Sequence, residues 1–159
     1  MTVTELIFVC ALLMLSWVFP GEGFDVKEDE GPVSQRDPQD RLSRMWEQQV
    51  DFMKLLQQER NFPEFPTDLS SKKGQKFLDD IRHHCQDELH EAAQHLKNSK
   101  SHRATEIPEI DREAFLEELV DALHLYFELV IASGISLEEL VEAYLQKGRV
   151  NVDRIKNGY

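Results

Sequence analysis

Residues 115–127 read FLEELVDALHLYF, in which apolar side chains recur every three or four positions. This is the period of an amphipathic α-helix. Asp111 can cap the start of the helix, and Gly134 can end it as the glycine just past its last turn. Within the helix, Glu118 and Asp121 are three residues apart and therefore lie on one face. The stretch predicts a helix that presents two carboxylates in one direction.

A second stretch, HCQDELHEAAQHL at residues 84–96, repeats this arrangement with Glu88 and Glu91. If the two helices pack side by side, four carboxylates converge between them. Four like charges remain together only when cations neutralise them, and carboxylate oxygens are the ligands that Mg²⁺ prefers. We therefore expect a Mg²⁺ or Mn²⁺ site between two antiparallel helices.

The large apolar side chains of the helix around residues 115–127 form one stripe on a helical projection. We expect this stripe to face the core; its members are Leu116, Leu119, Leu123, Phe127 and Val130. The other side carries Glu118, Asp121 and Glu128, and such a face is ordinarily covered by solvent. Two observations favour a metal site instead. Apolar residues interrupt the acidic face, and no Lys or Arg follows any of the four paired acids at the fourth position, where an ion pair would form.

The rest of the chain from residue 41 onward also has a helical period, without strand-like alternation or internal repeats. Ser70 or Ser71 can cap the helix that carries Glu88, and Ser136-x-x-Glu139 is a capping box for a last helix. We expect Gly148 to break that last helix. The predicted helices are residues 41–60, 71–97, 112–132 and 137–146, with one or two further turns in the tail. The predicted fold class is all-α, a bundle of four to five main helices.

The chain has 159 residues, the size of one ordinary domain, and a net charge of −12. An acidic surface repels nucleic acid, so we expect no nucleic-acid partner. Composition divides the chain into an apolar segment at residues 1–23, a polar linker at residues 24–40 and a helical domain at residues 41–159. Cys10 and Cys85 do not indicate a disulfide framework and are interpreted as small apolar residues.

Residues 6–19, LIFVCALLMLSWVF, form a run that is short for a membrane span and suits the apolar part of a signal peptide. No Lys or Arg precedes the run, and Glu5 stands at its edge, which disfavours a signal. A signal or membrane anchor is one interpretation of residues 6–19. An accessory apolar segment without a targeting role is the other.

Two histidines near the acidic pairs suggest a different metal. His124 follows Asp121 by three residues, and His95 follows Glu91 by four. A ferritin-like di-iron site needs Glu-x-x-His on two helices, and here the spacing is right on one helix only, with Asp in place of Glu. We therefore interpret His124 as a hydrogen-bonded residue that supports the acids from behind.

Metal ions held by carboxylates commonly bridge phosphate oxygens, which also need basic partners. Two basic clusters stand out in this acidic chain. They are Lys147, Arg149, Arg154 and Lys156 in the tail, and Lys97, Lys100, His102 and Arg103 in the loop before the third helix. Gln49 lies on the core side of the first predicted helix, where an unpaired amide is unfavourable, and is a candidate reader of a nucleobase.

The tail and the acidic pairs together resemble the dimeric dUTPase and phage dCTP/dUTP pyrophosphatase family, an all-α group related to the MazG-like nucleotide pyrophosphatases. The shared pattern is E-x-x-D, an apolar helix bearing a histidine, a Gly turn, a short helix and K-x-x-x-N-x-x-R-x-x-x-G-Y. In this chain its members are Glu118, Asp121, His124, Gly134, Lys147, Asn151, Arg154, Gly158 and Tyr159. Glu88-x-x-Glu91 matches the family's other metal pair, and residues 45–66 look like its base-side helix. The resemblance covers residues 41–159, and Gly148 departs from it, because the family often has Asn there.

The resemblance implies Mg²⁺-dependent hydrolysis of dUTP and/or dCTP to the monophosphate and pyrophosphate, by a homodimer in the cytoplasm of a cell or an infected host. It implies that Glu88, Glu91, Glu118 and Asp121 hold the metal and catalyse, that Lys147, Asn151, Arg154 and Tyr159 contact phosphates, and that Gln49 contacts the base. Two alternatives stay open. One is a house-cleaning pyrophosphatase for non-canonical nucleotides, and the other is a non-catalytic helical interaction module tethered by the apolar N-terminus.

Overall fold

The computed structural model describes residues 38–96, 102 and 104–158, and every regular element in this part of the chain is an α-helix. Four helices follow one another: α2 (Pro38–Arg60), α3 (Lys72–His95), α4 (Arg112–Ala132) and α5 (Leu137–Lys156). The all-α prediction is confirmed. The apolar run at residues 6–19, most of the predicted linker and Tyr159 lie outside the described residues.

The starts of three helices are fixed by the side chains that the sequence predicts as caps. Ser71 accepts a hydrogen bond from the backbone N–H three residues later at 2.9 Å, and Asp111 does the same at 3.1 Å. Ser136 and Glu139 form a reciprocal capping box at the start of α5. α2 begins three residues before the predicted start, at Pro38, whose fixed φ angle suits the first position of a helix.

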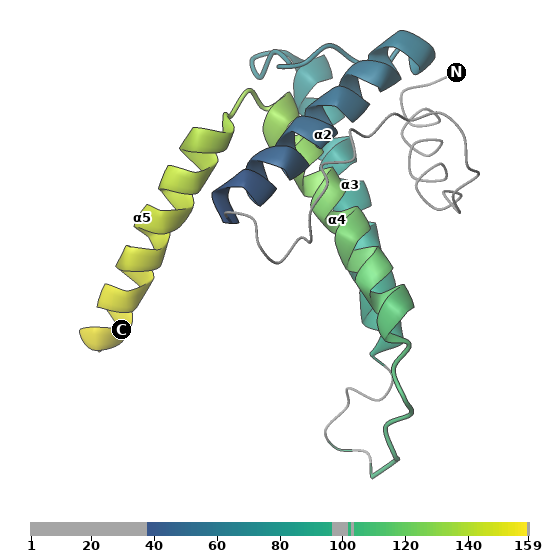
Figure 1. The fold of residues 1–159 in the computed structure, drawn as a ribbon, viewed down its shortest axis with the longest axis vertical. Helices are drawn as coiled ribbons and strands as arrows, with labels where there is room; N and C mark the ends of the chain where they lie inside the picture. The colour runs from purple at the N-terminus through teal and green to yellow at the C-terminus, as the bar shows by residue number, and fades with distance from the viewer. Residues whose placement is uncertain (1–37, 97–101, 103, 159) are drawn as a thin grey trace.

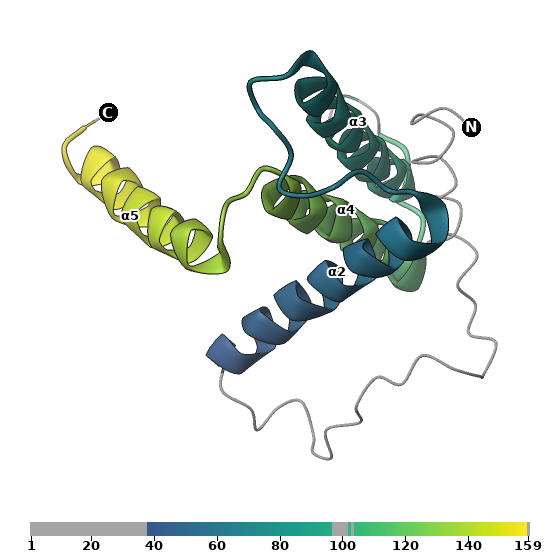
Figure 2. The ribbon, with the colours of Figure 1, turned by 90° about the horizontal axis from the view of Figure 1, so that it is seen from above.

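α3 and α4 run antiparallel and side by side, and α2 crosses the pair (Figure 1, Figure 2). The core lies where these three helices meet, and Met53, Ile81 and Ala132 are fully buried there. Trp46 of α2 packs edge-on against Phe127 of α4, with their ring centroids 5.7 Å apart. The crossing therefore places α2 within two helical turns of Asp121 on α4.

α5 runs without interruption to Lys156, so the prediction that Gly148 breaks it is wrong. A glycine inside a helix costs about 1 kcal/mol relative to alanine, and the capping box and the helix-forming residues on either side offset this cost. α5 stands apart from the other three helices in both views (Figure 1, Figure 2), and none of its residues is buried. Among the described helices, no single one is long and apolar enough to cross a membrane; α4 and α5 meet that test only as a pair bent by 110°.

The face of α4 that packs inward is the acidic one, so the prediction of its core stripe is wrong for most of the stripe. Asp121, Leu125 and Glu128 are buried, while Leu116 is 57% exposed. Leu119 and Leu123 are also exposed, and only Phe127 and Val130 of the predicted stripe are buried.

α3 shows a similar departure. Phe77, Ile81 and Ala92 recur at helical spacing and are buried, but Leu89 and Leu96, which continue this apolar spacing, are exposed while Glu88 is buried. A helical projection ranks the faces of one helix by apolarity alone. The projection contains no information about the partner helix. Because α3 and α4 meet through small residues and carboxylates, their leucines lie on the outer faces.

Candidate metal centre

Three carboxylates from two helices converge at the contact between α3 and α4. Glu88 of α3 and Glu118 and Asp121 of α4 each offer one oxygen, and these oxygens all lie within 4.8 Å of one another. Glu88 is 7% exposed and Asp121 is 9% exposed, which is deep burial for ionisable side chains. The structure thus brings together three of the four predicted carboxylates. The fourth, Glu91, is exposed on α3.

Small residues allow the two helices to approach closely at this point. Ala92 of α3 and Ala122 of α4 are both buried. The Cys85 thiol of α3 donates to the backbone oxygen of Ala122 at 3.4 Å. This close packing puts side chains from opposite helices within reach of a single ion.

Two buried oxygens of the cluster, Oε2 of Glu88 and Oε2 of Glu118, have no hydrogen-bond partner. A buried polar atom left without a partner costs about 1–3 kcal/mol, and more when it is charged. A divalent cation between the helices would satisfy both oxygens and neutralise the converging charges. The all-carboxylate set of oxygens fits Mg²⁺ or Mn²⁺ better than softer metals.

The two histidines do not complete a di-iron arrangement. His95 comes within reach of the cluster, with its Nε2 atom 3.8 Å from Oε1 of Glu118. In the described part of the chain, however, the group that could hold one ion contains carboxylates only. The geometry therefore favours the carboxylate site over the ferritin-like alternative.

The crowding of acids raises the pKa of two of them. Burial raises the pKa of Glu88 to about 7, and the negative charges of Asp121, Glu91 and Glu118 add to this effect. Burial raises the pKa of Asp121 to about 6, with further contributions from the charges of Glu118, Glu117 and Glu91. Without a cation, the centre therefore holds protons that ordinary carboxyls would have released.

Glu128 is a buried carboxyl that the sequence did not single out as a site residue. It is 2% exposed, and burial raises its pKa to about 8. Its spacing of seven residues from Asp121 places it two turns further along the same face of α4. This spacing is the one feature of the sequence that relates Glu128 to Asp121. It indicates a buried carboxyl only if the acidic face of α4 is already known to be the buried face.

Gln49 and His124 form a buried polar pair between α2 and α4. Oε1 of Gln49 lies 2.7 Å from Nδ1 of His124, and because an amide oxygen only accepts, the hydrogen is on Nδ1. Burial lowers the pKa of His124, which favours this neutral form. Gln49 is 1% exposed, and its Nε2 atom has no partner. The pair therefore holds an unused amide donor about one helical turn from Asp121.

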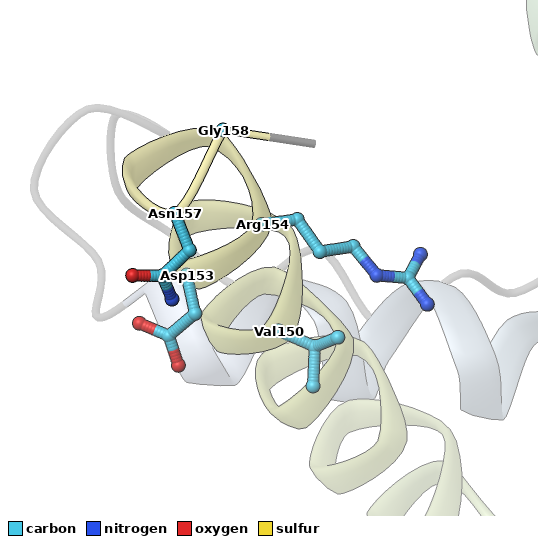
Figure 3. Close-up of a pocket in the computed structure, with 5 residues that line it drawn as sticks. All are labelled: Val150, Asp153, Arg154, Asn157 and Gly158. Carbon is cyan, nitrogen blue, oxygen red and sulfur yellow. The ribbon is translucent and has the colours of Figure 1, made fainter.

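Three of the four residues predicted to bind phosphate lie on α5, which stands apart from the pair of helices, α3 and α4, that carries the carboxylates (Figure 1). Lys147, Asn151 and Arg154 are all exposed. Near the end of α5, Val150, Asp153, Arg154, Asn157 and Gly158 line a shallow hollow (Figure 3). In this hollow the Arg154 side chain points away from Asp153 and Asn157. A single chain therefore does not join the predicted phosphate residues to the acidic centre.

No protein-family model, curated protein or solved structure matches this chain. The resemblance to dimeric dUTPases accordingly rests on the sequence motifs, and the function it implies is a proposal.

The raised pKa values predict how the stability of the metal-free protein depends on pH. Glu88, Asp121 and Glu128 have folded-state pKa values of about 7, 6 and 8 against ordinary values of 4.5, 3.8 and 4.5. Between the ordinary and the raised value, the folded state binds more protons than the unfolded state. The free energy of unfolding therefore falls as pH rises from about 5 to about 8.

Urea unfolding in EDTA, followed by circular dichroism at several pH values, checks this prediction. Addition of Mg²⁺ at pH 8 should recover much of the lost stability, because a cation favours the ionised carboxylates. A metal-free protein whose stability is constant or rises over this range would contradict it.

Proposed function

We propose that this chain is a Mg²⁺-dependent nucleoside triphosphate pyrophosphohydrolase that acts on dUTP and/or dCTP. The observation that carries the proposal is the convergence of Glu88, Glu118 and Asp121 around buried oxygens that lack partners. Such a centre suits phosphate chemistry, because ions held by carboxylates also coordinate phosphate oxygens. The motif resemblance supports the choice of a pyrimidine deoxynucleotide.

In the proposed reaction, water attacks the α-phosphorus and the bond to the α–β bridging oxygen breaks, so that the nucleoside monophosphate and pyrophosphate are formed. Glu88, Glu118 and Asp121 hold the metal, with Glu91 at the rim of the site. When bound, Mg²⁺ supplies positive charge to the phosphates and lowers the pKa of water that it holds. One of the carboxylates accepts the proton that the attacking water loses.

The remaining predicted residues take supporting roles. Lys147, Asn151 and Arg154 share one face of α5, because they are spaced by four and three residues, and they bind the phosphates. Gln49 contacts the base through its unused Nε2 donor. The proposal includes a homodimer, which the exposed leucines of α4 support, because large exposed apolar patches commonly mark interfaces.

The direct test incubates the purified chain with Mg²⁺ and each deoxynucleoside triphosphate, and separates the products by chromatography. We expect monophosphate and pyrophosphate from dUTP, dCTP or both, and no product in EDTA. A panel of modified nucleotides distinguishes this activity from house-cleaning hydrolysis. Lack of turnover with every nucleotide, together with a melting temperature that Mg²⁺ does not raise, would overturn the proposal in favour of a non-catalytic helical module.

A further inference from the structure

We propose that His95 supplies a nitrogen ligand at the rim of the metal centre, where it shares an ion with Glu118, and that this nitrogen makes the protein prefer Mn²⁺ to Mg²⁺. The inference rests on the metal centre of the proposed function, but it concerns the ion alone and its test needs no nucleotide. His95 does not belong to the motifs E-x-x-E and E-x-x-D that predict the carboxylate centre.

His95 and Glu118 face each other at the outer end of the contact between α3 and α4. Nε2 of His95 lies 3.8 Å from Oε1 of Glu118. That separation is longer than a hydrogen bond, which spans about 2.7–3.2 Å. Two ligand atoms that each lie about 2.1 Å from one ion are about 3.0 to 4.2 Å apart, depending on the angle between them. The two side chains are therefore separated by a distance that suits a shared metal ion.

The imidazole of His95 has no hydrogen-bond partner, in contrast to two other histidines of α3. Nδ1 of His83 lies 2.8 Å from the backbone oxygen of Asp79, and Nδ1 of His90 lies 2.7 Å from that of Gln86. Those two rings are held by their own helix. Within the described part of the chain, neither ring nitrogen of His95 is held in this way, and its side chain is 27% exposed. A lone pair of this imidazole is therefore available to an ion from solvent.

The carboxylates beside His95 carry negative charge that lacks partners. Oε2 of Glu118 is buried without a hydrogen bond, and so is Oε2 of Glu88, a residue that is only 7% exposed. Glu91 precedes His95 by four residues and so lies on the same face of α3. Its charge adds to burial in raising the pKa of Glu88 and of Asp121, which places Glu91 close to both. An ion between His95 and Glu118 therefore has further carboxylates nearby.

His95 lies beyond the three carboxylates that converge most closely. Among the described acids, Glu118 is the one that comes within 4 Å of it. Because α3 and α4 are antiparallel, the seven residues from Glu88 to His95 lead about 10 Å along α3 toward the start of α4. Exposure also rises in this direction, from 7% for Glu88 to 27% for the His95 side chain. The nitrogen ligand therefore belongs to the end of the centre that solvent reaches.

A nitrogen ligand discriminates between the two metals that the carboxylates fit. Mg²⁺ prefers oxygen ligands and retains its bound water, whereas transition metals bind nitrogen more readily. Replacement of one water by His95 should therefore increase the affinity for Mn²⁺ and have little effect on Mg²⁺. We expect Mn²⁺ to bind about tenfold more tightly than Mg²⁺. In His95→Gln the affinity for Mn²⁺ should fall by about tenfold, and that for Mg²⁺ should change by less than about threefold.

Electron paramagnetic resonance on the full chain, loaded with Mn²⁺ and without nucleotide, tests the inference. A nitrogen bound directly to Mn²⁺ modulates the electron spin echo, so the modulation should be present in the wild type and absent in His95→Gln. Calorimetric titration with Mn²⁺ and with Mg²⁺ gives the two affinities. The matched control is His90→Gln, which removes an imidazole held by its own helix and should change neither result. All three proteins should melt at similar temperatures in EDTA, because neither ring is buried.

The opposite results overturn the inference and differ in what they mean for the proposed function. If Mn²⁺ binds without nitrogen modulation, or if the modulation survives in His95→Gln, the carboxylate centre stands and His95 is not its ligand. Equal affinities of the wild type for the two ions would contradict the preference for Mn²⁺. If neither ion binds, the inference fails together with the metal centre of the proposed function.

Discussion

The double variant Glu118→Gln/Asp121→Asn is expected to lose pyrophosphohydrolase activity by roughly a thousandfold or more, the scale on which loss of a catalytic group acts. In EDTA the same variant is expected to melt at a higher temperature than the wild type. Both results have one cause. The two carboxylates face Glu88 across the α3–α4 contact, where a metal ion would need their charge and the metal-free fold is destabilised by it.

The gain in stability follows from the geometry of the cluster. The amides have nearly the shape of the carboxylates that they replace, so packing is kept while repulsion is removed. They also supply N–H donors beside Oε2 of Glu88, which has no partner in the wild type. A gain on the order of 1 kcal/mol is expected from one new buried hydrogen bond.

Differential scanning fluorimetry with and without Mg²⁺ measures the change in melting temperature, and an assay of pyrophosphate release measures the loss of activity. Mg²⁺ should raise the melting temperature of the wild type and leave that of the variant unchanged. The control is Glu138→Gln/Glu142→Gln, which makes the same change in net charge at exposed positions of α5. Full activity in the variant would show that the two carboxylates are not needed as metal ligands. A lower melting temperature in EDTA would show that their charge does not destabilise the metal-free fold.

The local signals in the sequence were sufficient to locate the starts of three helices and three of the four acids that were predicted to converge. Ser71, Asp111 and the Ser136 capping box start helices where their chemistry predicts, because a cap acts on backbone groups within one turn. The spacing within Glu88-x-x-Glu91 and Glu118-x-x-Asp121 likewise fixes which acids share a face. These features depend on neighbouring residues only.

The facing of α4 could not be predicted in the same way. The apolarity of Leu116, Leu119 and Leu123 pointed to a core, but α3 packs on the opposite side, through Ala122 and the carboxylates. Which face of a helix is buried depends on the helix that packs against it. A helix face that packs against a second copy of the chain has the same apolar pattern in the sequence as a face that packs in the core of one chain. In the proposed homodimer these exposed leucines lie at the interface between the copies, whereas the helical projection assigned them to the core of one chain.

Gln49→Leu is expected to raise the KM for the nucleotide by about 10- to 100-fold, the range for losing a hydrogen bond from a buried amide. The change in kcat should be much smaller, because in the proposed function Gln49 contacts the base and not the reacting phosphates. Since Oε1 of Gln49 is occupied by His124, only the Nε2 donor is available. The base must therefore present an acceptor, such as a carbonyl oxygen of a pyrimidine. Gln48→Leu, at the exposed neighbouring position, is the matched control.

In the proposed function His124 positions Gln49, and two substitutions can separate this role from a role in packing. In His124→Asn the side-chain N–H can take roughly the place of Nδ1, so Gln49 keeps its orientation and the KM should stay within about threefold of the wild type. His124→Phe keeps the ring but removes the donor, so Gln49 is free to turn and the KM should approach that of Gln49→Leu. Steady-state kinetics on folded variants distinguish these results. Equal KM values for the two His124 variants would mean that the histidine only fills space, and that the orientation of Gln49 is set by other contacts.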